Sequence, residues 1–93
     1  MIKSFADKQT AAVYKKLHVR KYSTDLQRAV YRKLKQLDAA VDIEDMRNPR
    51  GNRLERLGGD LSGLYSVRIN RQWRVCFEWR DGNAYDVEIR DYH

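Results

Sequence analysis

The sequence predicts an α+β fold, with two N-terminal helices packed on one face of a largely antiparallel sheet of four to five strands. Two observations carry this prediction. The first part of the chain has apolar residues at helical spacing, whereas residues 65–90 alternate apolar and polar side chains with a period of two. Helices followed by strands are typical of a fold in which the two kinds of element occupy separate layers of one core.

The length and composition indicate a single small domain over residues 1–93. A chain of 93 residues has room for one core. The sequence has no run of about 18 apolar residues, and its first residues lack the apolar stretch of a signal peptide. We therefore expect a cytoplasmic protein without membrane contact. The lone Cys76 cannot form an internal disulfide, and it suits a half-buried strand position better than a redox role.

Two segments have the start signals and apolar spacing of helices. Asp7 can cap a helix that runs to about Leu17, with Val13 and Leu17 on its buried side. Thr24 and Gln27 match a capping box at the start of the second helix. The stripe that this second helix should bury comprises Leu26, Val30, Leu34 and Leu37.

Five segments can form strands. Residues 2–5 could be a short edge strand, and residues 53–57 alternate as a strand before the three longer ones at 65–69, 73–79 and 85–90. The apolar residues of the long strands must share one face, which requires loops with an odd number of residues.

We therefore predict three-residue loops at 70–72 and 81–83, because a two-residue Asp-Gly turn would set Phe77 against Asp86. The resulting apolar face comprises Tyr65, Val67, Ile69, Trp73, Val75, Phe77, Trp79, Tyr85, Val87 and Ile89.

On the opposite face, the same register aligns Arg68, Arg74 and Arg90 in one row across three strands. Like charges directly opposite one another destabilise a sheet, so this row favours an anionic ligand such as phosphate. The alternative is a lattice of surface ion pairs between these arginines and the acidic residues of the same strands, which are Glu78, Asp86 and Glu88.

Basic residues are unevenly distributed along this chain of net charge +6. Every lysine lies within residues 1–37, whereas every basic residue after Lys35 is an arginine. Because arginine suits bidentate phosphate contacts and stacks on bases, we interpret the arginine segment as a nucleic-acid-binding surface and the lysine-rich helices as a solvated or partner-facing exterior. The arginines expected to bind the polyanionic partner are Arg53, Arg56, Arg71 and Arg90.

An acid–base set accompanies the arginines. Cleavage of RNA without a metal ion needs a base for the 2′-hydroxyl, positive charge for the phosphorane and an acid for the departing 5′-oxygen. Arg68 and Arg74 can supply the charge, and His93 can act as acid or base. Tyr92 can donate a hydrogen bond or stack on a base, and Asp91 can orient another group.

By strand parity Tyr92 shares the arginine face, whereas Asp91 and His93 point away unless the tail bends. The alternative for residues 91–93 is a frayed terminus. Glu55 lies amid arginines and can be either a base or a structural counter-ion.

We expect no metal ion or cofactor, because the two histidines are far apart in sequence and no phosphate-cradling glycine loop is present.

Four stretches closely resemble the HigB toxins of the RelE/ParE superfamily: residues 51–57 (GNRLERL), 63–70 (GLYSVRIN), 72–77 (QWRVCF) and 87–93 (VEIRDYH). The likeness covers nearly the whole chain and is most specific after residue 50. It implies a RelE-like fold with a concave basic face. It also implies a ribosome-dependent mRNA endonuclease that is neutralised by a helix-turn-helix, HigA-like antitoxin.

By the same resemblance, Arg68 and Arg74 match the strand arginines that contact the scissile phosphate, and residues 91–93 match the family's terminal motif, with His93 as the proton-transfer residue. Some members have a histidine where this chain has Glu55 and a lysine where it has Gly58. The identity of the second acid–base residue is therefore open. Either Glu55 replaces the histidine as the base, or the protein is a weaker catalyst.

Two other functions stay open from the sequence, which are a ParE-like gyrase poison and a non-catalytic RNA- or ribosome-binding module. We expect the antitoxin to contact the lysine-rich helices, where charge reversal at Lys33 and Lys35 should weaken the complex, or the exposed edge strand. The free toxin is expected to be monomeric.

Overall fold

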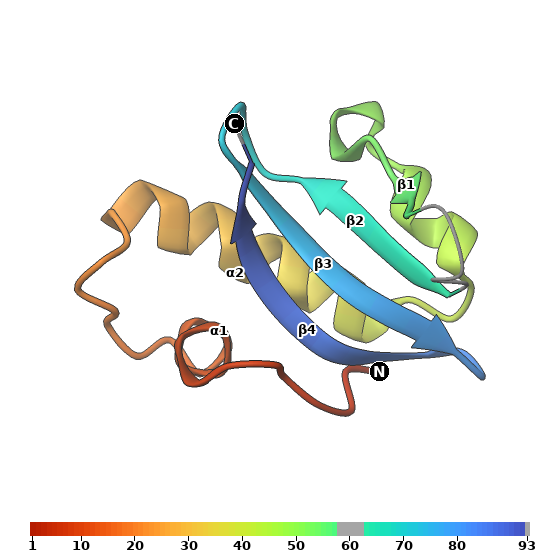
Figure 1. The fold of residues 1–93 in the computed structure, drawn as a ribbon, viewed down its shortest axis with the longest axis horizontal. Helices are drawn as coiled ribbons and strands as arrows, with labels where there is room; N and C mark the ends of the chain where they lie inside the picture. The colour runs from red at the N-terminus through yellow and green to blue at the C-terminus, as the bar shows by residue number, and fades with distance from the viewer. Residues whose placement is uncertain (58–62, 93) are drawn as a thin grey trace.

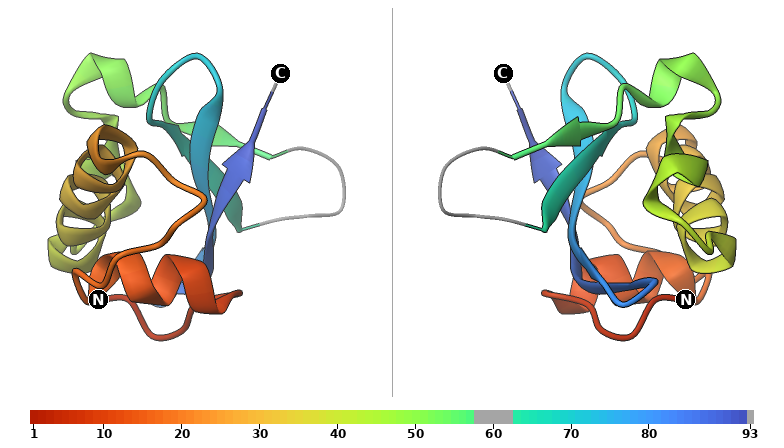
Figure 2. Two further views of the ribbon diagram at one scale, coloured as in Figure 1. Left: turned by 90° about the vertical axis from the view of Figure 1, so that its left-hand side faces the viewer. Right: turned by 90° about the vertical axis from the view of Figure 1, so that its right-hand side faces the viewer.

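Both helices pack on one face of a four-stranded antiparallel sheet, which confirms the predicted fold class (Figures 1 and 2). The computed structural model describes residues 1–57 and 63–92. The strands lie side by side in the order β1-β2-β3-β4. In chain order the elements are α1 (Lys8–Tyr14), α2 (Thr24–Ala39), the short 3-10 helices η1 (Ile43–Arg47) and η2 (Arg50–Asn52), β1 (Glu55–Arg56), β2 (Leu64–Arg68), β3 (Trp73–Arg80) and β4 (Asn83–Asp91).

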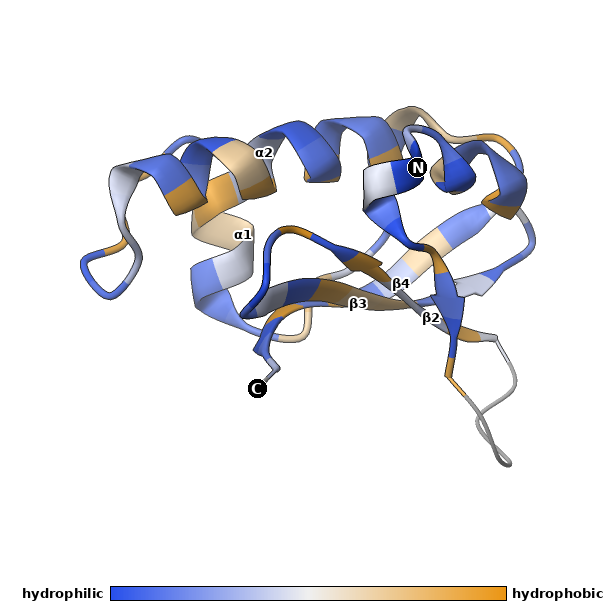
Figure 3. Ribbon diagram, turned by 90° about the horizontal axis from the view of Figure 1, so that it is seen from above, coloured by the Kyte–Doolittle hydropathy of each residue, from blue (hydrophilic) through white to orange (hydrophobic). Residues whose placement is uncertain are grey.

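The core lies between α2 and the sheet. The four apolar residues predicted for the buried stripe of α2 are all buried, and the apolar positions of this helix turn towards the strands (Figure 3). Burial of these side chains is the main favourable contribution to the stability of so small a domain. The sheet residues that complete this core with no more than 1% exposure are Val67, Val75, Phe77, Ala84 and Val87.

Helix α1 starts as predicted but ends earlier. The side chain of Asp7 accepts a hydrogen bond from the Thr10 amide, which confirms the cap. The helix stops at Tyr14 in a Schellman motif, in which Lys16 has a φ of 61° and the Leu17 amide donates to the Ala12 carbonyl. The predicted burial of Leu17 is wrong, because this turn leaves its side chain 57% exposed.

Helix α2 is capped one residue before the predicted position. The Ser23 hydroxyl accepts from the Leu26 amide, so Ser23 is the N-cap and Thr24 is already helical. The Gln27 side chain does not close a capping box with Thr24. Instead it accepts from the Val19 amide and donates to the Tyr22 carbonyl, which ties the loop between the helices to the first turn of α2.

The register of the sheet aligns the predicted arginine row. Arg68 of β2 pairs with Arg74 of β3, and Arg74 pairs with Arg90 of β4. The β2–β3 loop has the predicted three residues, and the Asn70 side chain closes it by accepting hydrogen bonds from two backbone amides. Val67 and Val75 are buried against the helices, so the arginine row occupies the uncovered face of the sheet.

The β3–β4 connection differs from the prediction. Arg80 pairs with Asn83, so the turn has two residues, and both of them, Asp81 and Gly82, have positive φ as a type I′ turn requires. A β-bulge restores the register, because Asp86 takes a φ of 52° and the pairing shifts between Cys76 and Glu78.

The bulge changes which face one aromatic side chain occupies. Tyr85 pairs with Glu78 and lies on the arginine face instead of the predicted apolar face, while Ala84 takes the buried place opposite Trp79. On that face the Arg80 guanidinium stacks 3.9 Å from the centre of the Tyr85 ring.

Both edges of the sheet are shorter than the prediction. The strand expected over residues 53–57 is reduced to the two residues of β1, because Arg53 adopts a left-handed conformation with a φ of 42°. At the other edge, Ile2 and Phe5 form isolated parallel bridges to Ala84 and Val87 of β4 in place of a continuous strand.

Candidate active face

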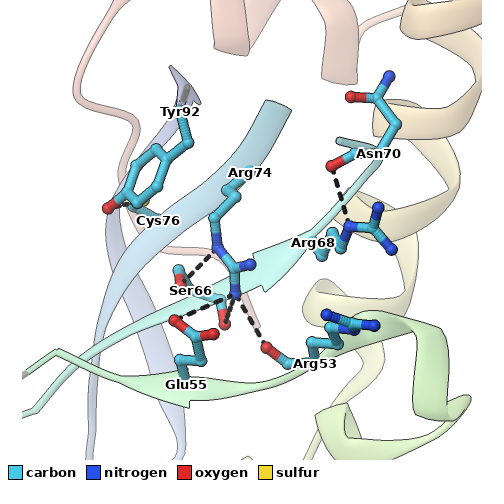
Figure 4. A network of polar contacts seen from close by, with 8 residues as sticks. All are labelled: Arg53, Glu55, Ser66, Arg68, Asn70, Arg74, Cys76 and Tyr92. Atoms are coloured by element: carbon cyan, nitrogen blue, oxygen red, sulfur yellow. Dashed lines mark hydrogen bonds and ion pairs between the residues drawn. The ribbon is translucent and has the colours of Figure 1, made fainter. Parts of the chain in front are cut away.

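Arg74 lies at the centre of the uncovered face and is tightly held there. Its Nε donates to the Ser66 hydroxyl at 2.9 Å, and its Nη2 donates to the Arg53 carbonyl at 2.9 Å and to the Ser66 carbonyl at 3.4 Å (Figure 4). The Glu55 carboxylate lies 3.8 Å from Nη2. With only 8% of the residue exposed, Arg74 is a buried cation that is compensated on two of its three nitrogens.

The local backbone explains how Arg74 obtains these partners. The left-handed conformation of Arg53 turns the chain after η2, so that its carbonyl faces the sheet and Glu55 enters β1 opposite Ser66. Ser66 itself is fully buried and precedes Arg68 by two positions on the same face of β2. No described residue accepts a hydrogen bond from Nη1 of Arg74, so that nitrogen is available to a ligand.

Arg68 and Arg90 have different surroundings. The Nε of half-buried Arg68 donates to the Asn70 carbonyl at 3.1 Å, and its two terminal nitrogens have no acceptor among the described residues. Arg90 is exposed and forms an ion pair with Glu88, which raises the pKa of the guanidinium. A second pair joins Arg80 to Glu78 at 3.1 Å. Of the ion-pair lattice considered from the sequence, only the Arg90–Glu88 pair forms among the described residues, since Glu78 pairs with Arg80 and Arg68 has no ion pair there.

Tyr92 lies beside Arg74, directly after the end of β4. Its ring centre lies 5.9 Å from the guanidinium carbon of Arg74, and its hydroxyl lies 3.9 Å from the Cys76 thiol (Figure 4). The backbone amide of Tyr92 donates to the Gln72 carbonyl, which holds this residue against the β2–β3 loop. Burial raises the pKa of the Cys76 thiol, which therefore stays protonated near neutral pH. Residue 92 is thus positioned as a partly exposed aromatic surface beside the arginines.

The structure separates Asp91 from the row. Asp91 pairs with Trp73, so it points to the other side of the sheet from Arg74, as strand parity predicts. Its carboxylate accepts from the Gln72 side-chain amide at 3.1 Å. Asp91 therefore anchors the end of β4 to the β2–β3 loop. The predicted proton-transfer residue His93 lies outside the described residues, as does Gly58.

The outer arginines lie on three separate segments, and the pairing of Arg56 with Tyr65 turns Arg56 away from the face that carries Glu55 and Ser66, which contradicts its predicted place on one binding surface with the arginine row. Arg53 follows η2, Arg56 lies in β1 opposite Tyr65, and Arg71 lies in the β2–β3 loop. All three are exposed. The sequence reasoning did not identify Ser66 as a functional residue, although its position as a small polar residue on the arginine face was visible.

The chemistry of this face is that of an anion site. Among residues 1–57 and 63–92, no group of three or more His, Cys, Asp or Glu side chains could hold a metal ion. In the same ranges, no helix has the length and apolar content needed to span a membrane. Nη1 of Arg74 and the terminal nitrogens of Arg68 have no acceptor among the described residues, so both guanidinium groups offer donors that suit a phosphate, and Tyr92 lies beside Arg74 (Figure 4).

Comparisons with known proteins agree with this geometry. A family model described as RelE-like toxin of type II toxin-antitoxin system HigB matches residues 3–93. Toxin HigB-1 of Vibrio cholerae serotype O1 is 43% identical over 91 residues, which covers 96% of this chain and 95% of that protein. Endoribonuclease HigB of Proteus vulgaris is 29% identical over 93 residues, with full coverage of both chains.

Solved structures share the fold at low sequence identity. The YoeB–YefM complex from Staphylococcus aureus contains a chain that matches with a TM-score of 0.62 at 20% identity, covering 100% of this chain and 98% of that one. YafQ from E. coli strain BL21(DE3) matches with a TM-score of 0.56 at 8% identity, covering 98% and 93%. The fold of this chain thus recurs in those structures.

Proposed function

Because the chain belongs to the family of RelE-like toxins of type II toxin–antitoxin systems, we propose that it is an endoribonuclease that cleaves mRNA on the translating ribosome. A relative that matches over its full length carries the name endoribonuclease. The reaction that fits the side chains of this face is a metal-independent transfer of the scissile phosphate to the neighbouring 2′-hydroxyl, with proton transfer by acid and base groups.

The observation that carries the proposal is the set of polar contacts that holds the Arg74 guanidinium. Two of its nitrogens are tied to Ser66, Arg53 and Glu55, and the third has no acceptor among the described residues. A guanidinium that is already oriented loses little entropy when it binds a phosphate and needs no reorganisation as charge develops. Arg68, opposite Arg74 in the register, supplies further donors. Together they stabilise the extra negative charge of the phosphorane.

Proton transfer is assigned to groups beside this pair. His93 is the proposed general acid or base, since an imidazole titrates near neutral pH. The side chain of Glu55 is 58% exposed and adjacent to Arg74, so it is within reach of a substrate as the base for the 2′-hydroxyl. Tyr92 is proposed to stack on a base next to the cleaved bond. Asp91 acts by positioning the residues that follow β4.

The proposed partners follow from the same face and from the family. The mRNA and the ribosome contact exposed arginines, with Arg53, Arg71 and Arg90 near the row and Arg56 at the sheet edge. The ribosome orients the message and so compensates for a small catalytic set. A cognate HigA-like antitoxin neutralises the toxin. We place the free toxin in the cytoplasm as a monomer.

The test is translation of a defined message in a purified system, with mapping of new 5′ ends in the presence and absence of ribosomes. Arg68→Ala and His93→Ala should each slow cleavage by about 10²–10³-fold, the usual effect of removing one group that stabilises or protonates the transition state. Arg20→Ala is the matched control, because Arg20 is an exposed arginine in the loop between α1 and α2. It should cleave like the wild type.

Other outcomes separate this activity from its rivals. Stalled translation with an intact message, unchanged by His93→Ala, indicates a non-catalytic ribosome-binding protein. Normal translation accompanied by gyrase-dependent DNA breaks indicates a gyrase poison. Either result contradicts the endoribonuclease proposal.

A further inference from the structure

The helices α1 and α2 form a layer on one side of the sheet (Figures 2 and 3). A groove is lined by residues from the end of α1 and from the first half of α2, in this helical layer. Its volume is about 490 Å³. On α2 it extends from Thr24 to Arg32, which corresponds to about 12 Å of helix at 1.5 Å per residue. A cavity of this size accepts a few side chains of a bound peptide segment.

The floor of the groove is apolar. It is formed by buried Val13, by half-buried Tyr31 and by Leu17, whose side chain is 57% exposed. The Schellman motif fixes Leu17 in this position, because its amide is bonded to the Ala12 carbonyl and Lys16 before it is left-handed. The exposure of Leu17 is therefore a property of the turn. An exposed apolar surface that is rimmed by polar residues is typical of a protein–protein contact.

The rim of the groove is positively charged. Lys16, His18, Arg28 and Arg32 line it, and no aspartate or glutamate does. No described residue forms an ion pair with Arg28 or Arg32, and Lys16 lies over the Tyr31 ring at 4.9 Å. Two arginines one helical turn apart on α2 thus present uncompensated guanidinium groups above an apolar floor.

We propose that this groove binds an acidic amphipathic segment of the antitoxin, a proposal that rests on the proposed function. An apolar side chain of the segment packs on exposed Leu17, while its carboxylates pair with Arg28 and Arg32. An apolar floor favours a protein over a nucleic acid, because RNA would use the cations but leave Leu17 exposed to water. The lysines that the sequence singled out lie elsewhere, since Lys35 stacks on Tyr14 and neither Lys33 nor Lys35 lines the groove.

The test measures the affinity of the toxin for the purified antitoxin encoded beside it, by titration calorimetry at two salt concentrations. The double variant Arg28→Glu/Arg32→Glu should bind at least 100-fold more weakly, with the larger loss at low salt. Leu17→Ser should lose about tenfold, with little dependence on salt. The matched control is Lys8→Glu/Arg20→Glu, which changes the net charge equally at exposed positions outside the groove and should stay within threefold of the wild type.

Thermal unfolding checks that each variant is folded, and cleavage in the translation assay is measured in parallel. Cleavage by the groove variants should equal that of the wild type, because no groove residue belongs to the active face. Equal losses of antitoxin affinity in the groove and control pairs would overturn the proposal. It is also overturned if the groove pair binds the antitoxin normally but loses affinity for ribosomes. A wild-type protein that binds antitoxin at this groove but cleaves no message refutes only the proposed activity.

Discussion

Substitution of Ser66 by alanine should weaken both the fold and the catalysis, because it removes the acceptor that orients Arg74. The hydroxyl accepts from Nε at 2.9 Å, and both residues are buried. A hydrogen bond to a charged group contributes about 1.5–3 kcal/mol, and its loss here leaves a donor of a buried cation unpaired. We expect Ser66→Ala to lower the free energy of unfolding by about 2 kcal/mol, which is roughly 8–16 °C in Tm for a domain of this size.

The effect on cleavage should be separable from the effect on stability. Arg74 keeps its contacts with the Arg53 carbonyl and with Glu55, so the guanidinium remains near the phosphate but is less well oriented. We expect cleavage in the translation assay to be about tenfold slower, or 1.4 kcal/mol of barrier. Urea unfolding of the free protein and initial rates of message cleavage measure the two quantities.

Ser23→Ala is the control for this experiment. It removes the N-cap of α2, which should cost about 1 kcal/mol of stability, at a position remote from the active face. Its cleavage rate should match the wild type at a temperature where both proteins are folded. If Ser66→Ala cleaves as fast as Ser23→Ala, the reasoning that Ser66 positions Arg74 is refuted. An unchanged unfolding midpoint for Ser66→Ala would refute the stability estimate.

Three further predictions test other parts of the structure. Tyr92→Phe should keep cleavage within about threefold while Tyr92→Ala loses about tenfold or more, because the ring and not the hydroxyl is proposed to stack on a base; equal losses in the translation assay would contradict this. Gly82→Ala should lower the free energy of unfolding by about 1 kcal/mol in urea, since the turn requires a φ of 76° there and an added Cβ meets only ordinary contacts; an unchanged value would argue against the type I′ turn. The hydrogen bond from the Ile2 amide to Asp38 lowers the pKa of this carboxyl in the folded state, so its contribution to stability is present above the ordinary value of 3.8 and is lost as the pH falls through the lower folded-state pKa. Asp38→Asn should therefore flatten the unfolding free energy against pH below that value, and parallel curves for the two proteins would exclude the assignment.

The arginine row could be predicted from the sequence for two reasons. Side chains alternate along a strand with a period of two, and the helices cover only one face of the sheet. These conditions leave little freedom in the register of the strands. The alignment of Arg68, Arg74 and Arg90 needs only that their neighbours Val67, Val75 and Ile89 share the core. The β3–β4 turn could not be predicted in the same way. The expectation of a loop with an odd number of residues excluded a two-residue turn, but a β-bulge can correct the register after such a turn. Asp86 does so, and Tyr85 changes face as a result.

The other differences arise where local and tertiary interactions compete. Ser23 and Thr24 are both good caps, and the choice between them depends on how Gln27 binds the preceding loop. Leu17 fits a helical stripe in sequence, but α1 ends before it in a left-handed turn. The burial of Arg74 depends on the Arg53 carbonyl, a contact 21 residues away that no periodicity reveals.

The bridges from Ile2 and Phe5 to Ala84 and Val87 join segments at opposite ends of the chain. Such a contact closes a very long loop, so it forms late and at a large entropic cost. During synthesis this sheet edge stays open until β4 has left the ribosome. A chain in which β4 has not yet paired therefore lacks both its completed sheet and the Arg90 position of the row.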